Sequence, residues 1–322
     1  MATVFAGFSG ALLACAGILG FEDLSLEGRD AEGPDSGGPD AAQQADTGPC
    51  GYDKPFRTPV RVDLTPDGLK WGAWLTPEED RIYFSSYPDG GIADLYVAAR
   101  DGGHGPFGPA QALGCCDAGA HEINPTLTKK DGLMVFAASD REEKQYDLFA
   151  ARWLDGSKAF GELRELGPLN SDAHEWAPFL AADGRTLWFA SFRNNNWDIY
   201  VASMTADGGV GNPAPVGIND RNTQDDNPVL SADGHHLYFS SSRKGTKGDV
   251  AVWVAHRDNV SDDLNSWNSP ILAGVPEIVV APEVDSPIAE RPLWISPDEC
   301  RLYYTIHRGP KYRQTYMVER GP

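Results

Sequence analysis

A unit of about 50 residues occurs five times in the chain, and this repeat limits the available folds more than any other feature. Each copy reads as a strand, a tight turn, a second strand, a polar loop and a third strand. Equivalent aromatic residues mark the second strand of each copy and lie 52, 53, 50 and 65 positions apart: Phe84, Phe136, Phe189, Phe239 and Tyr304. Repeats of this length with several strands each are typical of β-propellers.

A fourth, shorter strand follows each copy except the last, and this predicts how the ring closes. The five copies are Trp74–Arg100, Pro125–Arg152, Pro178–Ser203, Pro228–Arg257 and Pro292–Arg320. Arg57–Leu64 stands before the first copy and matches the strand that the last copy lacks. Pairing the two would remove an exposed sheet edge, which is a site of aggregation. The sequence therefore predicts an all-β fold, a single β-propeller of five four-stranded blades.

The repeat also carries a motif. The pattern S-x-D-G-x-x-[LI]-[YW]-F-x-S-x-R, followed by D-[IL]-Y-V-A, resembles the WD40-like repeat of TolB-type β-propellers. The resemblance runs from Arg57 to the C-terminus. It implies a propeller of the bacterial envelope lipoprotein type, and it makes six blades, the common number in such proteins, the alternative to five. Propellers host many unrelated activities, so the motif alone assigns no function.

The first 52 residues predict two further segments. Residues 1–20 are apolar and uncharged, as in a secretory signal, and Leu12–Cys15 (LLAC) resembles a lipobox that would lipidate Cys15. Cleavage without lipid at Ala14–Ala16 and an uncleaved anchor are the alternatives. Residues 21–52 are rich in Gly, Pro, Asp and Ala and predict a disordered acidic linker, which leaves 53–322 as the propeller. The expected location is the periplasm or cell surface, with a lipid anchor in the outer membrane; secretion is the alternative.

Charge and missing motifs exclude several classes of function. A formal net charge of −20 repels phosphate backbones, so we expect no nucleic-acid partner and no membrane contact beyond the anchor. The sequence contains no phosphate loop, dinucleotide fingerprint or G-x-S-x-G motif, and we expect no cofactor and a monomer. The absence of a C-x-x-C pair disfavours a structural zinc site, and His235 and His236 are predicted to be exposed turn residues.

Acidic residues recur where the first strand of a blade would begin. The stretches AHEINP, AHEWAP and QDDNP contain the candidate ligand-binding residues His121, Glu122, His174, Glu175, Trp176 and Asp225. In one interpretation they bind a neutral or cationic ligand at the mouth of the central channel. In the other, each carboxylate caps backbone amides at the start of its strand. No catalytic residue is assigned.

These features favour an extracytoplasmic, membrane-tethered propeller that binds a protein or a glycan of the cell envelope. The alternative is a carbohydrate-active enzyme, a glycoside hydrolase or lyase, that uses the carboxylates at the channel mouth.

Two further pairings are predicted. Asp198, at the start of a third strand, is expected to bond Ser191 and Arg193 of the second strand in its own blade. Cys50 and Cys300 are expected to form a disulfide, because Cys300 lies in a turn of the last blade and Cys50 lies seven residues before the strand that closes the blade.

Overall fold

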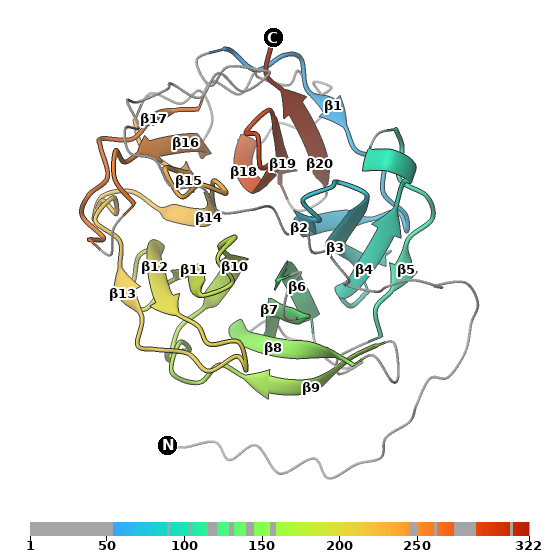
Figure 1. Cartoon of the computed structure of the whole chain (residues 1–322), viewed down its shortest axis with the longest axis horizontal. Coiled ribbons are helices and arrows are strands. Elements are labelled where there is room, and N and C mark those ends of the chain that lie inside the picture. The colour runs from blue at the N-terminus through green and yellow to red at the C-terminus, as the bar shows by residue number, and fades with distance from the viewer. Residues whose placement is uncertain are drawn as a thin grey trace, which may run out of the picture.

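The structure of the chain is a computed structural model, and it describes residues 54–88, 91–103, 105–114, 121–128, 132–139, 145–154, 159–244, 250–260, 263–273, 288–309 and 312–321. In this part of the chain, five four-stranded antiparallel sheets stand around a central axis as the blades of a propeller (Figure 1). The five sheets confirm the predicted all-β propeller with five blades rather than the six-bladed alternative.

Each blade has four strands, ordered from the axis outward. The first strands are β2 (Leu69–Leu75), β6 (His121–Thr128), β10 (Glu175–Leu180), β14 (Asp225–Leu230) and β18 (Ile288–Ile295). The second strands are β3 (Arg81–Tyr87), β7 (Leu133–Ser139), β11 (Thr186–Ser191), β15 (His236–Ser241) and β19 (Arg301–Arg308). The third strands are β4 (Asp94–Ala99), β8 (Asp147–Leu154), β12 (Asp198–Ser203), β16 (Ala251–His256) and β20 (Tyr312–Glu319). The outer strands are β5 (Gln111–Ala112), β9 (Ala159–Glu165), β13 (Ala214–Pro215), β17 (Ile271–Leu272) and β1 (Val60–Arg61). A short 3-10 helix, Asp101–Gly103, follows β4.

The second strands are buried because neighbouring blades cover both of their faces. The aromatic residues that mark this strand in each repeat have at most 1% of their surface exposed: Phe84, Phe136, Phe189, Phe239 and Tyr304. A strand covered on both faces carries apolar residues at consecutive positions, as in Leu237–Phe239. The core therefore consists of apolar layers between adjacent blades.

The last blade takes its outer strand from the start of the propeller. Val60 of β1 is paired with Met317 of β20, and Arg61 is paired with Tyr316, in antiparallel register. Figure 1 shows β1 and β20 side by side although they come from opposite ends of the sequence. The predicted role of Arg57–Leu64 as the closing strand is confirmed.

Bulges in the inner strands narrow the channel along the axis. Four residues at the bulges have positive φ: Gly72 (60°), Asn124 (55°), Ala177 (46°) and Asn227 (51°). A Cβ atom on Gly72 would lie 2.5 Å from the Cα atom of Asn124, so the closest approach of the first two blades requires glycine. The bulges and Pro292 line a cavity of about 20 Å³, which has room for about one water molecule. A sugar cannot enter the channel at this level.

The predicted N-terminal segment 1–20 with Cys15, and the predicted linker 21–52 with Cys50, lie outside the described residues. Cys300 is disulfide-bonded, and its partner also lies outside them, so the pairing with Cys50 stays a prediction. None of the helices among the described residues has the length and apolar character needed to span a membrane.

Candidate functional site

The candidate residues lie on one end of the propeller, which we call the upper face. It is the end where the first and third strands of each blade begin and the second strands finish. On this face Glu175 is fully buried. Its Oε1 atom accepts hydrogen bonds from the hydroxyls of Ser171 (2.6 Å) and Ser191 (2.7 Å), and a guanidinium nitrogen of Arg193 lies 3.4 Å away. Its Oε2 atom accepts the backbone N–H of Ser171 at 3.0 Å.

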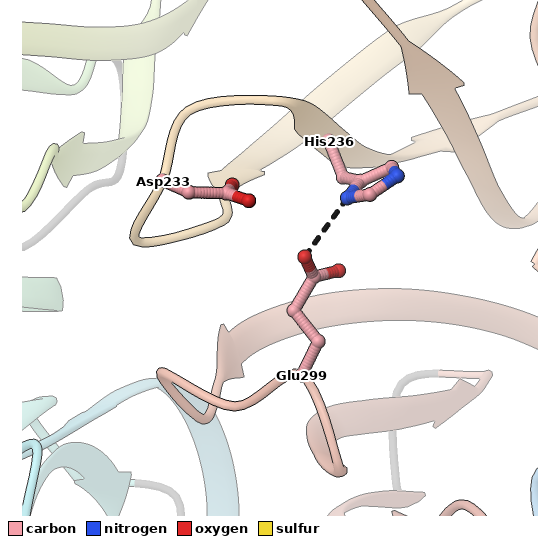
Figure 2. A group of neighbouring side chains, drawn as sticks. All are labelled: Asp233, His236 and Glu299. Atoms are coloured by element: carbon pink, nitrogen blue, oxygen red, sulfur yellow. Dashed lines mark hydrogen bonds and ion pairs between the residues drawn. The ribbon is translucent and has the colours of Figure 1, made fainter. Parts of the chain in front are cut away.

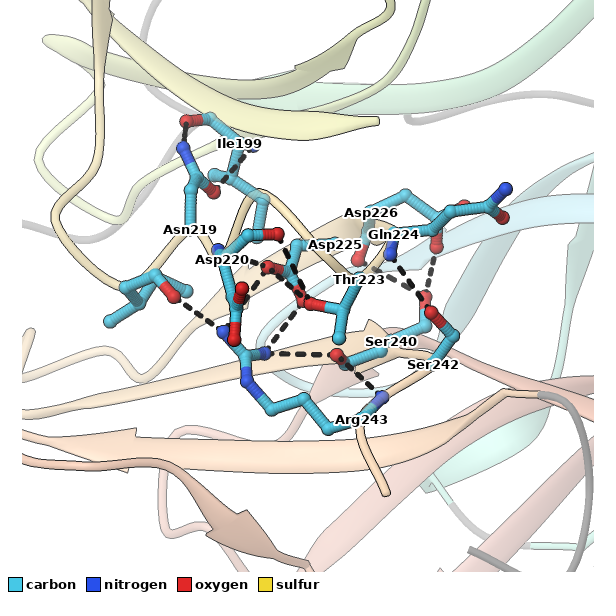
Figure 3. Close-up of polar contacts among 12 residues, drawn as sticks. Ile199, Asn219, Asp220, Thr223, Gln224, Asp225, Asp226, Ser240, Ser242 and Arg243 are labelled. Carbon is cyan, nitrogen blue, oxygen red and sulfur yellow. Dashed lines mark hydrogen bonds and ion pairs between the residues drawn. The ribbon is translucent and has the colours of Figure 1, made fainter. Parts of the chain in front are cut away.

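Asp225 occupies the same position in the next blade and is also fully buried (Figure 3). Arg243 binds both of its oxygens, at 2.6 and 3.1 Å, and the backbone N–H of Asp220 donates to Oδ2 at 3.0 Å. Burial raises the pKa of Asp225, against the hydrogen bond from Ser241 and the charge of Arg243, which lower it. Both carboxylates thus accept a backbone amide of the connection that enters the blade and bind an arginine just after the second strand.

The predicted partners of Asp198 are wrong. Ser191 and Arg193 contact Glu175 instead, although Ser191 is paired both with Glu175 of β10 and with Asp198 of β12. Asp198 accepts a hydrogen bond from the side chain of Asn196 at 3.2 Å.

The two candidate histidines bridge neighbouring blades. Nδ1 of His121 accepts the backbone N–H of Ala93 at 3.1 Å, and Nδ1 of His174 accepts that of Tyr146 at 3.3 Å. The backbone N–H of Glu122, which is 5% exposed, donates to the carbonyl of Ala93. Because Nδ1 accepts in both histidines, a neutral ring carries its proton on Nε2.

Trp176 stacks on a second tryptophan on the upper face. Its ring is parallel to that of Trp197, with an interplanar angle of 1° and centroids 4.1 Å apart, and Phe192 packs against Trp197 at 5.3 Å. Both indoles are half-buried. Nε1 of Trp176 has no hydrogen-bond partner among the described residues. The stack is therefore a flat, half-buried apolar platform, and the indole N–H of Trp176 is itself buried.

The platform is one end of a series of rings that we call the aromatic arc. It runs through the first three blades and consists of Trp71, Tyr87, His121, Tyr146, His174, Trp197 and Trp176. The hydroxyls of Tyr87 and Tyr146, 3.2 Å apart, join its two halves. The half-buried members are Trp71, His174, Trp176 and Trp197. Three of the seven members, His121, His174 and Trp176, are among the candidate ligand-binding residues. The others are Trp71 of the first strand β2 and the aromatic residues at the upper ends of second and third strands, Tyr87, Tyr146 and Trp197.

The opposite end of the channel is wider and apolar. A cavity of about 250 Å³ opens there, and its lining includes Trp74, Leu127, Phe179, Leu230 and Trp294. All five residues belong to the apolar core, so this cavity continues the core to the surface.

A second cluster of polar side chains lies on this lower face, where the turns between first and second strands gather. Asp233, His236 and Glu299 place their ligand atoms within 4.8 Å of one another (Figure 2). His236 is half-buried and contacts Glu299 of the neighbouring blade at 2.8 Å. His235 is also half-buried, with Nδ1 2.8 Å from the carbonyl oxygen of Arg257, so the prediction of exposed turn residues is wrong for both. Asp233, His236 and Glu299 come together only because neighbouring blades are aligned in this way, so no local sequence pattern predicts the cluster.

Comparison with known proteins gives similarity in fold. No protein-family model and no curated protein matches the chain. An α-L-arabinofuranosidase from Lactobacillus brevis aligns with a TM-score of 0.52 and 15% identity, over 81% of this chain and 94% of the enzyme. A thermostable family-43 glycoside hydrolase aligns at 0.49 and 13%, over 80% and 91%. TolB from Acinetobacter baumannii aligns at 0.46 and 15%, over 78% of this chain and 55% of TolB. The predicted TolB-like β-propeller is confirmed in its fold by the five sheets described above.

Proposed function

We propose that this protein is an extracytoplasmic binding propeller, tethered to the cell envelope through its N-terminal segment, which binds a neutral glycan on its upper face. The observation that carries the proposal is the parallel stack of Trp176 and Trp197, half-buried beside the channel mouth. A flat indole offers a large rigid contact area to the apolar C–H face of a sugar ring.

The state of the carboxylates supports binding rather than hydrolysis. A glycosidase needs two carboxyl groups that flank a bound sugar, one of them free to give and take a proton. Glu175 and Asp225 are fully buried and held by Arg193 and Arg243. Such carboxylates stabilise the structure of the upper face, and the aromatic rings beside them are the groups that contact the ligand.

One observation favours the enzyme alternative. Burial raises the pKa of Asp147, at the start of β8, to about 6, with Glu165 and Glu175 contributing in the same direction. A carboxylic acid with a raised pKa is what a general acid requires near neutral pH. Release of nitrophenol from a panel of aryl glycosides by the wild type, and its loss in Asp147→Asn, would establish the enzyme in place of the binding module.

Calorimetric titration with neutral envelope and plant-type oligosaccharides tests the proposal. We expect binding by the wild type and at least a tenfold loss in Trp176→Ala and in Trp197→Ala. Trp153→Ala is the matched control, because Trp153 is half-buried at the far end of β8, against Phe160. If the two upper-face variants bound the oligosaccharide as tightly as Trp153→Ala, a glycan platform on the upper face would be refuted. The absence of binding by the wild type would refute it too.

A further inference from the structure

The lower-face cluster joins the fourth and fifth blades. Glu299, in the turn before β19, reaches His236 at the start of β15, with Oε1 and Nδ1 2.8 Å apart. Its other oxygen accepts the hydroxyl of Tyr238 at 2.8 Å. Asp233, in the turn before β15, completes the group. The contact is therefore between a turn of one blade and the second strand of the blade before it.

The junction between the fifth and first blades is built in the same way and serves as an internal comparison. There Glu79 takes the part of Glu299: both residues have positive φ, at 56° and 54°. The hydroxyl of Tyr303 donates to Glu79 at 2.9 Å, as Tyr238 does to Glu299. The two junctions are thus formed by equivalent positions of the repeat.

They differ in the residue at the centre. In the junction of the fifth and first blades it is Arg301, which lies 2.6 Å from Glu79, 3.8 Å from Asp298 and 3.7 Å from Glu319. A guanidinium therefore sits among three carboxylates.

In the junction of the fourth and fifth blades, histidines occupy two of these positions. His236 replaces Arg301 and is paired in the sheet with His256, as Arg301 is with Glu319. Asp233 replaces Asp298, since each lies three residues before the central position. A guanidinium is always charged and has no lone pair to give, whereas a neutral imidazole has one.

We propose that a divalent transition-metal ion, of which Zn²⁺ is the type, takes the place of the guanidinium, bound by Asp233, Nδ1 of His236 and Glu299. Ligand bonds of about 2.0–2.2 Å hold donor atoms about 3–4 Å apart, so a small rotation of the side chains closes the present group on an ion. An imidazole ligand selects Zn²⁺ over Ca²⁺ and Mg²⁺, which prefer oxygen alone.

The surroundings of His236 suit a metal ligand. Its Nε2 atom lies 3.1 Å from Nδ1 of His256, and Nε2 of His256 lies 3.1 Å from Asp258. A metal-bound histidine commonly donates its second N–H to such a partner, which fixes the ring.

The test compares the wild type with His236→Arg, which installs the side chain that the neighbouring junction already accommodates. After treatment with chelator, the full chain is titrated with ZnCl₂ by calorimetry and followed by thermal unfolding. We expect one Zn²⁺ per chain and a rise in Tm for the wild type, no response to CaCl₂, and at least a hundredfold weaker Zn²⁺ binding in His236→Arg. His256→Phe should weaken binding about 10–100-fold by removing the acceptor.

His307→Gln is the control, because His307 lies near the end of β19 that is remote from Arg301 and should leave the titration unchanged. Equal Zn²⁺ binding by the wild type and His236→Arg would overturn the proposal. The proposal would also be wrong if the Tm of the wild type did not change with Zn²⁺ but rose on acidification. The histidines would then replace arginine as protonated cations.

Discussion

Individual buried side chains on the upper face hold the connections between strands in place. Glu175 gathers two serine hydroxyls, a backbone amide and an arginine, and Asp225 repeats the arrangement with Arg243. The sequence showed that carboxylates recur before the prolines, but it did not show that an arginine 18 residues later returns to each of them. The contacts of Glu175 and Asp225, rather than their place at the channel mouth, therefore define their structural role.

Replacement of Glu175 by alanine should destabilise the protein by about 2–4 kcal/mol, because it leaves Arg193 and two serines without their shared acceptor. Glu175→Gln, which keeps an acceptor oxygen but loses the charge, should cost less. Urea unfolding of both variants measures the difference. A Glu175→Ala variant as stable as the wild type would show that the carboxylate holds nothing.

Asp147 should make stability depend on pH. Burial raises its pKa from 3.8 to about 6, so folding favours the protonated carboxyl. Its contribution is present below the lower value and is lost as the pH rises through the higher one. Asp147→Asn should therefore raise Tm relative to the wild type at pH 7.5 and have little effect at pH 3.5. Thermal scans across this pH range measure the effect, with Asp172→Asn as control because Asp172 is exposed. If Tm depends on pH in the same way in Asp147→Asn and in Asp172→Asn, the assignment to Asp147 is wrong.

At the scale of strands, the closing strand β1 carries little apolar burial of its own, since both Val60 and Arg61 are exposed. Its contribution is to pair with the backbone of β20, including the hydrogen bonds from Arg57 N–H to Glu319 and from Val62 N–H to Thr315. A strand can thus be short and still decide whether a sheet edge is open.

Removal of residues 54–64 should leave β20 as a free edge and cause self-association. Size-exclusion chromatography with light scattering should show oligomers at concentrations where the full chain elutes as a single smaller species. A matched deletion control keeps the length but replaces 54–64 with a Gly/Ser linker, which should associate equally. A monodisperse, folded deletion variant would mean that β1 is dispensable.

Strands and their order were predictable from the sequence because each repeat carries its own alternation and turn signals. The closing strand was predictable because one copy lacked a partner. The contacts between blades were not, since they depend on the stagger of one sheet against the next. Comparison of the fourth and fifth copies at His236 and Arg301 is the one sequence signal that pointed to the lower-face cluster, and it has meaning only once Glu299 and Glu79 are seen to reach them.

For the whole molecule, ring closure is the property on which both faces depend. The channel is too narrow at the bulges to join the two faces, so a ligand on the aromatic arc and an ion at the lower-face cluster would bind independently. The negative charge of the chain, −20 in total, favours neutral or cationic ligands on either face.

The disulfide of Cys300 belongs to this scale, because a bond to Cys50 would close nearly the whole propeller in one loop. We expect peptide mapping without reduction to find Cys50 joined to Cys300, and Cys50→Ser to lower stability by about 2–4 kcal/mol. Reduction of the wild type should reproduce the loss, and reduction of the variant should add little. Cys300 joined to Cys115 or Cys116 would disprove the pairing.

The pairing of β1 with β20 also sets the order of events during synthesis. Val60 meets a partner, Met317, that lies 257 positions later, a delay of about 15–50 s at about 5–20 residues per second. Throughout that time the earliest strand has no place in a finished blade, while the inner blades can already assemble on one another. Contacts so distant in the chain form slowly. The propeller closes only once β20 has emerged, and a ribosome that stalls before β20 leaves the preceding blades in an unclosed ring.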